Sequence, residues 1–364
     1  MRGPATVLLC LALGCATERP ASIPAPAPIN GAAHGGGTTS PPPVAAAVGT
    51  PASFGEVDAL LRRTLPPWGG GVLRVEQDGA VIFEQAYGGY TVADAVPIGS
   101  ATKLLSVLVL LSLIRDGTLS LEQPAGALVP DWPKDKAAIT LRMLLAQTSG
   151  LPARSPCLET RSTTLPACVQ EIARTPLRAP PGTAFIDGGA GFQVAGRMAE
   201  LASGKPWALL MQTRLMDPLG LSSTGFGRTD NPRIAGGAQA NAVEYARVLR
   251  QLLPGPTPDL LGPTLRDAVL ADETRGVPLM QSAYALAPGR EGIRAGFGVY
   301  RDRVATDGRV LEALAQGVFG FTGWVDTDRR LVGVLVVRGK VSDVWPVEQR
   351  VRELVRQAVP VPAR

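Results

Sequence analysis

Ser100 and Lys103 are the residues whose types and spacing point most directly to a chemical reaction. They open the segment SATKLLSVLVLLSLIRDG, which is apolar on nearly all sides and is predicted as a buried helix ending at Gly117. A spacing of three residues puts the serine hydroxyl and the lysine amine on one face of that helix. Apolar surroundings favour a neutral lysine amine, which can take the proton of a serine hydroxyl. The pair suggests nucleophilic acyl transfer, although this spacing alone also fits a serine that only caps the helix.

The histidine content argues against most other hydrolytic mechanisms. The chain has one histidine, His34, which lies in a Pro-, Ala- and Gly-rich stretch. Ser-His-Asp and Cys-His hydrolases, and zinc hydrolases with histidine ligands, are therefore not expected. No Cys-x-x-Cys pair or Cys/His cluster suggests a metal site, so neither a metal nor an organic cofactor is expected. A general base must be a lysine, tyrosine, aspartate or glutamate.

The elements that would hold this pair come from both ends of the chain. A helix is predicted over 54–65, and apolar alternation broken at Asp78-Gly79 predicts a hairpin over 71–90. Residues 118–290 mix short helices with Pro and Gly turns. Four antiparallel strands and an amphipathic helix are then predicted at 297–304, 308–315, 320–327, 330–339 and 342–359. This order indicates an α+β domain whose antiparallel sheet is formed by both chain ends and flanked by helices, with a mainly helical region inserted.

Four blocks of sequence resemble one protein superfamily. The nucleophile helix continues into GTLSLEQPAGALVPDW, and ITLRMLLAQTSGLP follows. Further along come PPGTAFIDGGAGFQVAGRMAELASGKPWALLMQTRLMDPLGLSSTGF and GFGVYRDRVATDGRVLEALAQGVFGFTGWVDTDRRLVGVLVV. In colinear order over about residues 55–355, these blocks resemble the penicillin-binding and serine β-lactamase superfamily, with its class C β-lactamases, D-Ala-D-Ala carboxypeptidases and family VIII esterases. The resemblance implies a β-lactamase/transpeptidase-like fold and hydrolysis of an ester or amide through an acyl-enzyme on Ser100, with Lys103 moving protons.

The second motif of that superfamily, Tyr-x-Asn, is altered here. Alignment on Pro181-Gly182-Thr183 places Asp187 where the family has its tyrosine and Gly189 where it has its asparagine. A carboxylate near Lys103 would hold the amine in its charged form and oppose its action as a base. Alternatively, Asp187 could itself serve as the base, oriented by Lys103. Both interpretations stay open at this point.

The third motif, Lys-Thr-Gly or His-x-Gly in the family, corresponds to Ala315-Gln316-Gly317. Its cation or histidine is missing, so binding of a substrate carboxylate, as in penicillins and D-Ala-D-Ala peptides, is not supported. Gly317 is retained, which leaves the Val318 N–H available to form an oxyanion hole with the Ser100 N–H. Small uncharged esters or amides would still fit such a site.

The first 52 residues are predicted to serve export. Residues 1–15 combine Arg2 with an apolar run too short to span a bilayer, as in a signal peptide. The run ends in Ala-Leu-Gly-Cys15, which resembles a lipoprotein-signal box with Cys15 as the acylated residue; ordinary cleavage and an uncleaved anchor are the alternatives. Residues 16–52 are interpreted as a Pro/Ala/Gly-rich linker, either a tether or a leader without a role. The hydrolase domain is expected over 53–364, in the periplasm or cell envelope.

Charge and cysteine content constrain the partners. The net charge of +5, without blocks of like charge, gives no reason to expect a nucleic acid, and membrane contact is expected only through a lipid on Cys15. Cys157 and Cys168 could close a short loop as a disulfide in an oxidising compartment. The expected partner is a small-molecule or peptide substrate, with peptidoglycan as one candidate.

Three functions fit these residues. The first is a serine hydrolase, and the second is an impaired family member that binds cell wall or protein. The third is a covalent trap that Ser100 acylates and that releases its acyl group slowly. The fold alone does not choose among them.

Overall fold

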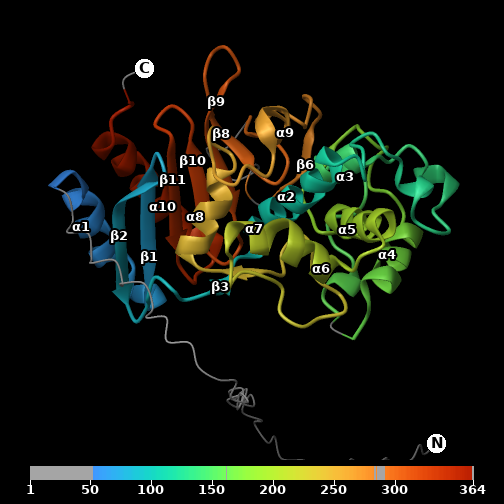
Figure 1. Cartoon of the computed structure of the whole chain (residues 1–364), viewed down its shortest axis with the longest axis horizontal. Helices are drawn as coiled ribbons and strands as arrows, with labels where there is room; N and C mark the ends of the chain where they lie inside the picture. The colour runs from blue at the N-terminus through green and yellow to red at the C-terminus, as the bar shows by residue number, and fades with distance from the viewer. Residues whose placement is uncertain (1–51, 161, 283, 285–291, 363–364) are drawn as a thin grey trace, which may run out of the picture. The chain divides into compact units, whose positions relative to one another are not determined.

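A seven-stranded antiparallel sheet organises the computed structural model, which describes residues 52–362 apart from 161, 283 and 285–291. The predicted signal segment with Cys15, and the predicted linker up to residue 51, lie outside the described residues. The strand order is β2-β1-β11-β10-β9-β8-β7 (Figure 1). The strands are β1 (Gly70–Gln77), β2 (Ala80–Gly88), β7 (Arg294–Ala295), β8 (Tyr300–Val304), β9 (Val310–Gln316), β10 (Thr322–Asp326) and β11 (Leu331–Val336).

The sheet joins the two ends of the chain, because an early strand pairs with a late one. β1 lies between its hairpin partner β2 and the late strand β11, with Val72 opposite both Ala86 and Val336. Every residue of β11 is buried, as expected for a central strand that is covered on both faces. The predicted sheet from both chain ends, flanked by helices, is therefore confirmed.

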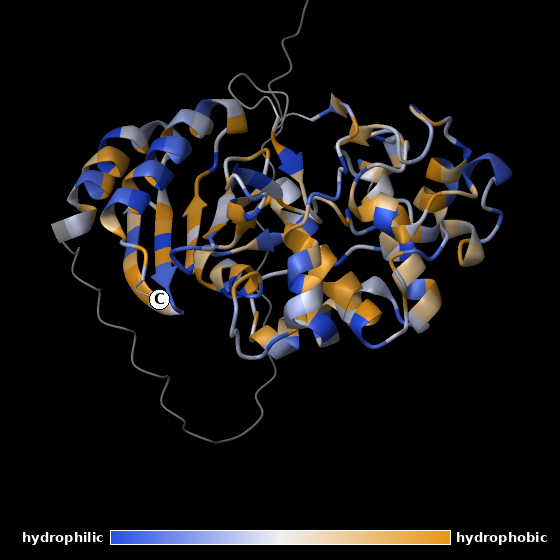
Figure 2. Cartoon of the chain, turned by 90° about the horizontal axis from the view of Figure 1, so that it is seen from above, coloured by the Kyte–Doolittle hydropathy of each residue, from blue (hydrophilic) through white to orange (hydrophobic). Residues whose placement is uncertain are grey.

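Helices cover both faces of the sheet. α1 (Gly55–Thr64) and α10 (Val341–Ala358) contact each other and share an apolar cluster with Leu73, Trp324 and Leu335. On the other face, α8 (Ala242–Arg250) packs on β1, β10 and β11. The central strands β1, β9, β10 and β11 are mostly buried between these layers, and orange (hydrophobic) segments run along strands of the sheet in Figure 2.

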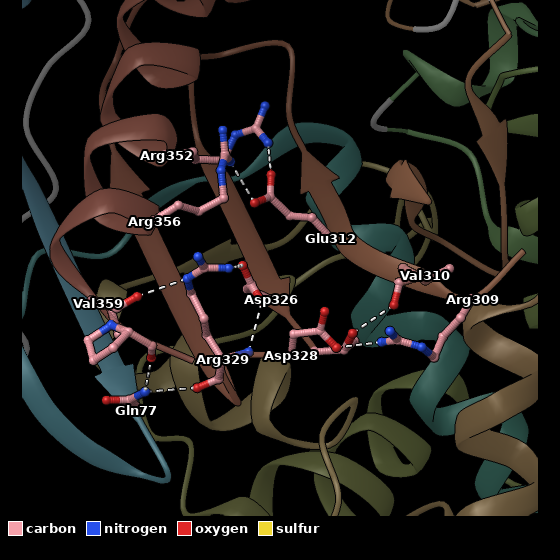
Figure 3. Close-up of polar contacts among 12 residues, drawn as sticks. Gln77, Arg309, Val310, Glu312, Asp326, Asp328, Arg329, Arg352, Arg356 and Val359 are labelled. Atoms are coloured by element: carbon pink, nitrogen blue, oxygen red, sulfur yellow. Dashed lines mark hydrogen bonds and ion pairs between the residues drawn. The ribbon is translucent and has the colours of Figure 1, made fainter. Parts of the chain in front are cut away.

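Polar contacts fasten α10 and the end of the chain to the sheet (Figure 3). Arg352 forms ion pairs with Asp302, Glu312 and Glu348, of which the bond from its Nη1 to Asp302 Oδ2 measures 2.6 Å. We call these four residues the arginine cluster. Arg356 adds a 2.8 Å bond to Glu312 Oε2, so two cations share one buried carboxylate. Removing one partner of a buried ion pair is strongly destabilising, so these contacts hold α10 in a fixed position on the sheet.

The mainly helical region occupies the middle of the chain. It contains α2 (Thr102–Arg115), α3 (Leu141–Leu145), α4 (Leu165–Arg174), α5 (Ala190–Ser203), α6 (Trp207–Met211), a π-helical turn (Gln212–Met216), α7 (Asp217–Leu219) and α9 (Gly262–Leu270). Two small sheets join β3 (Val96–Pro97) to β5 (Gln239–Ala240) and β4 (Phe185–Ile186) to β6 (Leu279–Gln281). Short 3₁₀ turns lie at Ala52–Phe54, Pro66–Trp68, Gly99–Ala101, Ala125–Ala127, Lys134–Lys136 and Pro156–Leu158. Within the described ranges, no helix is both long and apolar enough to cross a membrane.

Most predicted boundaries shift by one to three residues, and two of the shifts bear on the site. The helix expected to begin at Ser100 begins at Thr102, because Gly99–Ala101 form a 3₁₀ turn first. The strand expected over 297–304 begins only at Tyr300. Gly298 has a φ of +71°, and a Cβ there would lie 3.0 Å from the carbonyl carbon of Lys103, so this glycine lets the chain pass directly over the start of α2.

Candidate active site

Ser100 lies on a turn that is fixed from several sides. The Ile98 N–H donates to the Ala238 carbonyl at 3.0 Å, and the Tyr245 hydroxyl donates to the Ala101 carbonyl at 2.7 Å. Gly99 has a φ of +52°, which favours glycine. The N-cap residue of α2 is Ala101, and no side chain caps this helix end, so Ser100 does not act as its cap.

Lys103 lies one turn further along and brings its amine to the serine. It is 5% exposed, and its Nζ donates to Ser100 Oγ at 3.0 Å. The same Nζ lies 3.0 Å from Asp187 Oδ1 and 5.9 Å from the centre of the Phe192 ring. The amine therefore sits between a hydroxyl and a carboxylate in a largely apolar setting.

Asp187 is delivered by the loop between β4 and α5. Its N–H donates to the Gln281 carbonyl at 2.8 Å, and the next N–H, of Gly188, donates to Gln147 Oε1 at 2.8 Å. A Cβ on Gly188 would lie 2.2 Å from Ala153 Cα, so the loop packs tightly against the neighbouring turn. These contacts direct the Asp187 carboxylate toward Lys103. Asp187 is the residue that the sequence alignment places at the position of the family tyrosine.

Tyr300 is a site residue that the sequence analysis missed. From the first position of β8, its hydroxyl donates to Asp187 Oδ2 at 2.6 Å. It is one of five tyrosines in the chain. Once the motif tyrosine was found to be absent, a search of the other tyrosines for a replacement hydroxyl would have included it, but no local motif marks it.

Gly317 and Val318 lie against the nucleophile turn. A Cβ on Gly317 would lie 2.0 Å from the Ile98 carbonyl oxygen, and a Cβ on Gly99 would lie 3.0 Å from the Val318 nitrogen. Two glycines thus allow the end of β9 and the Ser100 turn to meet backbone to backbone. Ala315, at the aligned position of the motif cation, is buried and uncharged, and the Gln316 side chain is buried and faces Thr322 and Glu348.

A cavity of about 280 Å³ opens over these residues. Its lining includes Ser100, Lys103, Asp187, Val318 and Phe319, together with three charged side chains of the opposite wall: Arg154, Glu159 and Arg233. Phe319 is 47% exposed, and five residues of the lining also belong to an adjoining cavity of about 930 Å³. Ser100 therefore faces a solvent-accessible cavity with room for a substrate beyond the reacting atoms.

The wall opposite the sheet is tied by a disulfide. Cys157 and Cys168 are bonded at 2.03 Å, between the turn that leads to Glu159 and helix α4. Glu171 strengthens the same turn by accepting from the Ser155 hydroxyl at 2.6 Å and from the Cys157 N–H at 3.1 Å. In the part of the chain that the structure describes, no group of three or more His, Cys, Asp or Glu side chains could hold a metal ion.

Comparison with known proteins gives the same architecture. The Beta-lactamase family model matches residues 66–356. A lovastatin esterase of Penicillium rubens is 30% identical over 159 residues, covering 36% of this chain and 40% of the esterase. The D-alanyl-D-alanine-carboxypeptidase/endopeptidase AmpH of Escherichia coli (strain K12) is 29% identical over 142 residues, covering 36% of each chain. The chain thus matches well under half the length of these relatives.

One solved structure shows the likeness of fold over most of the chain. The penicillin-binding protein of Bacillus halodurans superposes with a TM-score of 0.64 at 17% identity. The match covers 81% of this chain and 99% of that protein. At this identity the likeness concerns the fold alone.

Proposed function

This chain belongs to the β-lactamase family, and we propose that it is an exported serine hydrolase that cleaves an ester or amide through an acyl-enzyme on Ser100. The observation that carries the proposal is the position of the Lys103 amine, 3.0 Å from both Ser100 Oγ and Asp187 Oδ1. An activated nucleophile requires a proton acceptor within hydrogen-bond reach. Here Lys103 is that acceptor for Ser100, and Asp187 is the partner of Lys103.

The proposed acylation moves two protons. Ser100 Oγ bonds to the substrate carbonyl carbon while its proton passes to Lys103 Nζ, and Lys103 passes one of its own protons to Asp187 Oδ1. The negative charge that forms on the carbonyl oxygen is held by the N–H groups of Ser100 and Val318. When the bond to the leaving group breaks, Lys103 returns a proton to the leaving oxygen or nitrogen and recovers one from Asp187. Water then releases the acyl group by the same route.

The expected substrates are small neutral esters or amides. On the wall formed by β9, the alignment puts Ala315 where the family carries its cation, and the neighbouring Gln316 side chain is buried against Thr322 and Glu348. A carboxylate on the substrate would therefore lack its usual partner on this wall. Hydrolysis of an ester, as the name of the Penicillium rubens relative states for that protein, fits this surface better than cleavage of a D-alanyl peptide.

A second candidate function is a binding module for cell wall or protein. It is favoured by the same ion pair, because a carboxylate 3.0 Å from an amine stabilises the ammonium form, which cannot take a proton. A covalent trap is intermediate between the two, since acylation would occur and hydrolysis would be slow. The lifetime of the acyl adduct separates the trap from a hydrolase that turns over.

Export and lipid attachment are part of the proposal. They are supported by the apolar run and the Ala-Leu-Gly-Cys15 box of residues 1–15. Substitution Cys15→Ala, followed by fractionation of expressing bacterial cells, tests the anchor. A lipoprotein moves from the membrane to the soluble fraction or is retained unprocessed, whereas a protein without the lipid keeps its distribution.

The test of the hydrolase is covalent labelling of the purified protein with a serine-reactive fluorophosphonate, followed by intact mass. We expect one adduct on the wild type and none on Ser100→Ala. Ser120→Ala is the matched control, because Ser120 is exposed and caps only a surface turn through the Glu122 N–H. Absence of an adduct on the folded wild type would reject the hydrolase and the trap and leave the binding module.

A further inference from the structure

Tyr300 completes a continuous hydrogen-bonded chain that begins at the nucleophile. Ser100 Oγ, Lys103 Nζ and Asp187 Oδ1 are joined by contacts of 3.0 Å, and Asp187 Oδ2 accepts from the Tyr300 hydroxyl at 2.6 Å. The two oxygens of one carboxylate are thus engaged by different partners. The tyrosine hydroxyl is also 2.9 Å from Ser282 Oγ.

The Tyr300 hydroxyl acts as a donor at every pH at which the protein would work. Burial, followed by the neighbouring charge of Asp187, raises the pKa of Tyr300 well above its ordinary value. Tyr300 therefore does not become the proton acceptor that the family tyrosine provides. Its effect on the site passes through the carboxylate to which it donates.

Neighbouring side chains fix the ring that carries this hydroxyl. The Tyr284 ring stacks on the Tyr300 ring with centroids 4.3 Å apart and an angle of 26° between the planes. The Tyr284 hydroxyl in turn donates to Asp302, a member of the arginine cluster, at 2.8 Å. The donor is therefore held by Tyr284, which lies between β6 and β7 and is itself bonded to β8 through Asp302.

We propose that Tyr300 is a positioning residue that engages Asp187 through Oδ2 and so weakens the hold of Oδ1 on the Lys103 ammonium. A hydrogen bond to a charged carboxylate draws negative charge toward the donor, so less remains for the lysine. Lys103 must accept the Ser100 proton, and its ion pair with Asp187 opposes this; the Tyr300 hydrogen bond reduces that opposition. The consequence for catalysis rests on the proposed hydrolase function, whereas the effect on the lysine amine does not.

The charged surroundings of this pair come from three places. Asp187 and Lys103 face each other from the β4–α5 loop and α2, and Tyr300 faces Asp187 from β8. The remaining charged side chains of the cavity are Arg154, Glu159 and Arg233, of which the last two pair with each other at 2.9 Å. Because Tyr300→Phe leaves all of these charged side chains in place, a change in the reactivity of the Lys103 amine can be assigned to the lost hydroxyl.

The test compares Tyr300→Phe with Tyr284→Phe in the full chain. Each substitution removes one hydroxyl from the same stacked pair, but only the first hydroxyl touches Asp187. The rate at which Lys103 is methylated by formaldehyde and cyanoborohydride is followed by peptide mass spectrometry from pH 6 to pH 10. Only the neutral amine reacts, so the profile reports the proton on Lys103 without any turnover. Fluorophosphonate labelling of Ser100 is measured in parallel over the same range.

We expect Tyr300→Phe to slow the methylation of Lys103 about tenfold at pH 8. Tyr284→Phe should follow the wild type. Superimposed profiles for all three proteins, or a Lys103 that reacts at no pH, would overturn the inference. A wild type that methylates at Lys103 but forms no adduct at Ser100 would instead reject the proposed hydrolase and leave the role of Tyr300 to be decided by the methylation profiles.

Discussion

Substitution Gly317→Ala tests the backbone geometry on which the proposed oxyanion hole depends. The added Cβ would lie 2.0 Å from the Ile98 carbonyl oxygen, whereas ordinary contacts begin near 3.4 Å. The end of β9 and the nucleophile turn must therefore separate by more than about 1 Å. An oxyanion donor is effective only over roughly 2.7–3.1 Å, a range about 0.4 Å wide, so this separation moves the Val318 N–H out of reach. Loss of one such donor lowers the rate by about 10²–10³-fold.

The assay is the rate of fluorophosphonate labelling at Ser100, measured together with thermal unfolding. We expect labelling to slow by about 10²-fold or more and the free energy of unfolding to fall by about 1–3 kcal/mol from overpacking. Gly89→Ala is the control, because a Cβ at Gly89 would contact nothing within 4 Å and its φ is not positive. A folded Gly317→Ala protein that labels within threefold of the wild type would refute the role of the Val318 N–H.

Three further changes probe stability. Replacing Cys157 and Cys168 by serine should lower the free energy of unfolding by about 3 kcal/mol, because the bond closes a loop across a separation of 11 residues; reduction of the wild type should reproduce the loss in thermal melts. Arg352→Met should cost about 3–5 kcal/mol in urea unfolding, since it removes the cation that Asp302, Glu312 and Glu348 share and leaves Glu312 only its bond to Arg356, whereas the exposed Arg350→Met should cost less than 1 kcal/mol. Burial alone would raise the pKa of Glu244, but hydrogen bonds from three neighbouring residues outweigh burial and lower that pKa. The Glu244 carboxylate therefore stabilises the fold at neutral pH, and this stabilisation is lost as the pH falls below about 4. The deficit of Glu244→Gln in urea unfolding should therefore shrink between pH 7 and pH 3.5, and an undiminished deficit would contradict the assignment.

Local spacing and the colinear blocks were sufficient to predict the sheet and the nucleophile helix. Ser100 and Lys103 are three residues apart, so a helix must bring them together wherever it lies in the fold. Asp187 was placed by alignment on a Pro-Gly-Thr turn, and the structure puts its carboxylate against the lysine. Sequence could not say how the carboxylate would be oriented, because that depends on what occupies its second oxygen.

Tyr300 shows why the rest of the site was not predicted. It lies 113 residues beyond Asp187, and its hydroxyl reaches the site only because β8 begins at that residue. The pattern 297–304 predicted a longer strand, since alternation alone does not reveal that Gly298 must pass over the backbone of Lys103. Long-range approach of two backbones is set by the tertiary structure, and a glycine in a strand-like run is only a weak sign of it.

The two altered motifs have related consequences for charge. In the proposed alignment, Asp187 in place of the family tyrosine puts a carboxylate 3.0 Å from Lys103 Nζ. In the same alignment, Ala315 takes the place of the motif cation and removes a positive charge from the facing strand. Both differences make the cavity less favourable for a substrate carboxylate, while the backbone amides that would hold a developing oxyanion are unaffected. A site altered in this way loses selectivity for anionic substrates before it loses the geometry of acyl transfer, which is why a neutral ester is the substrate with which to begin.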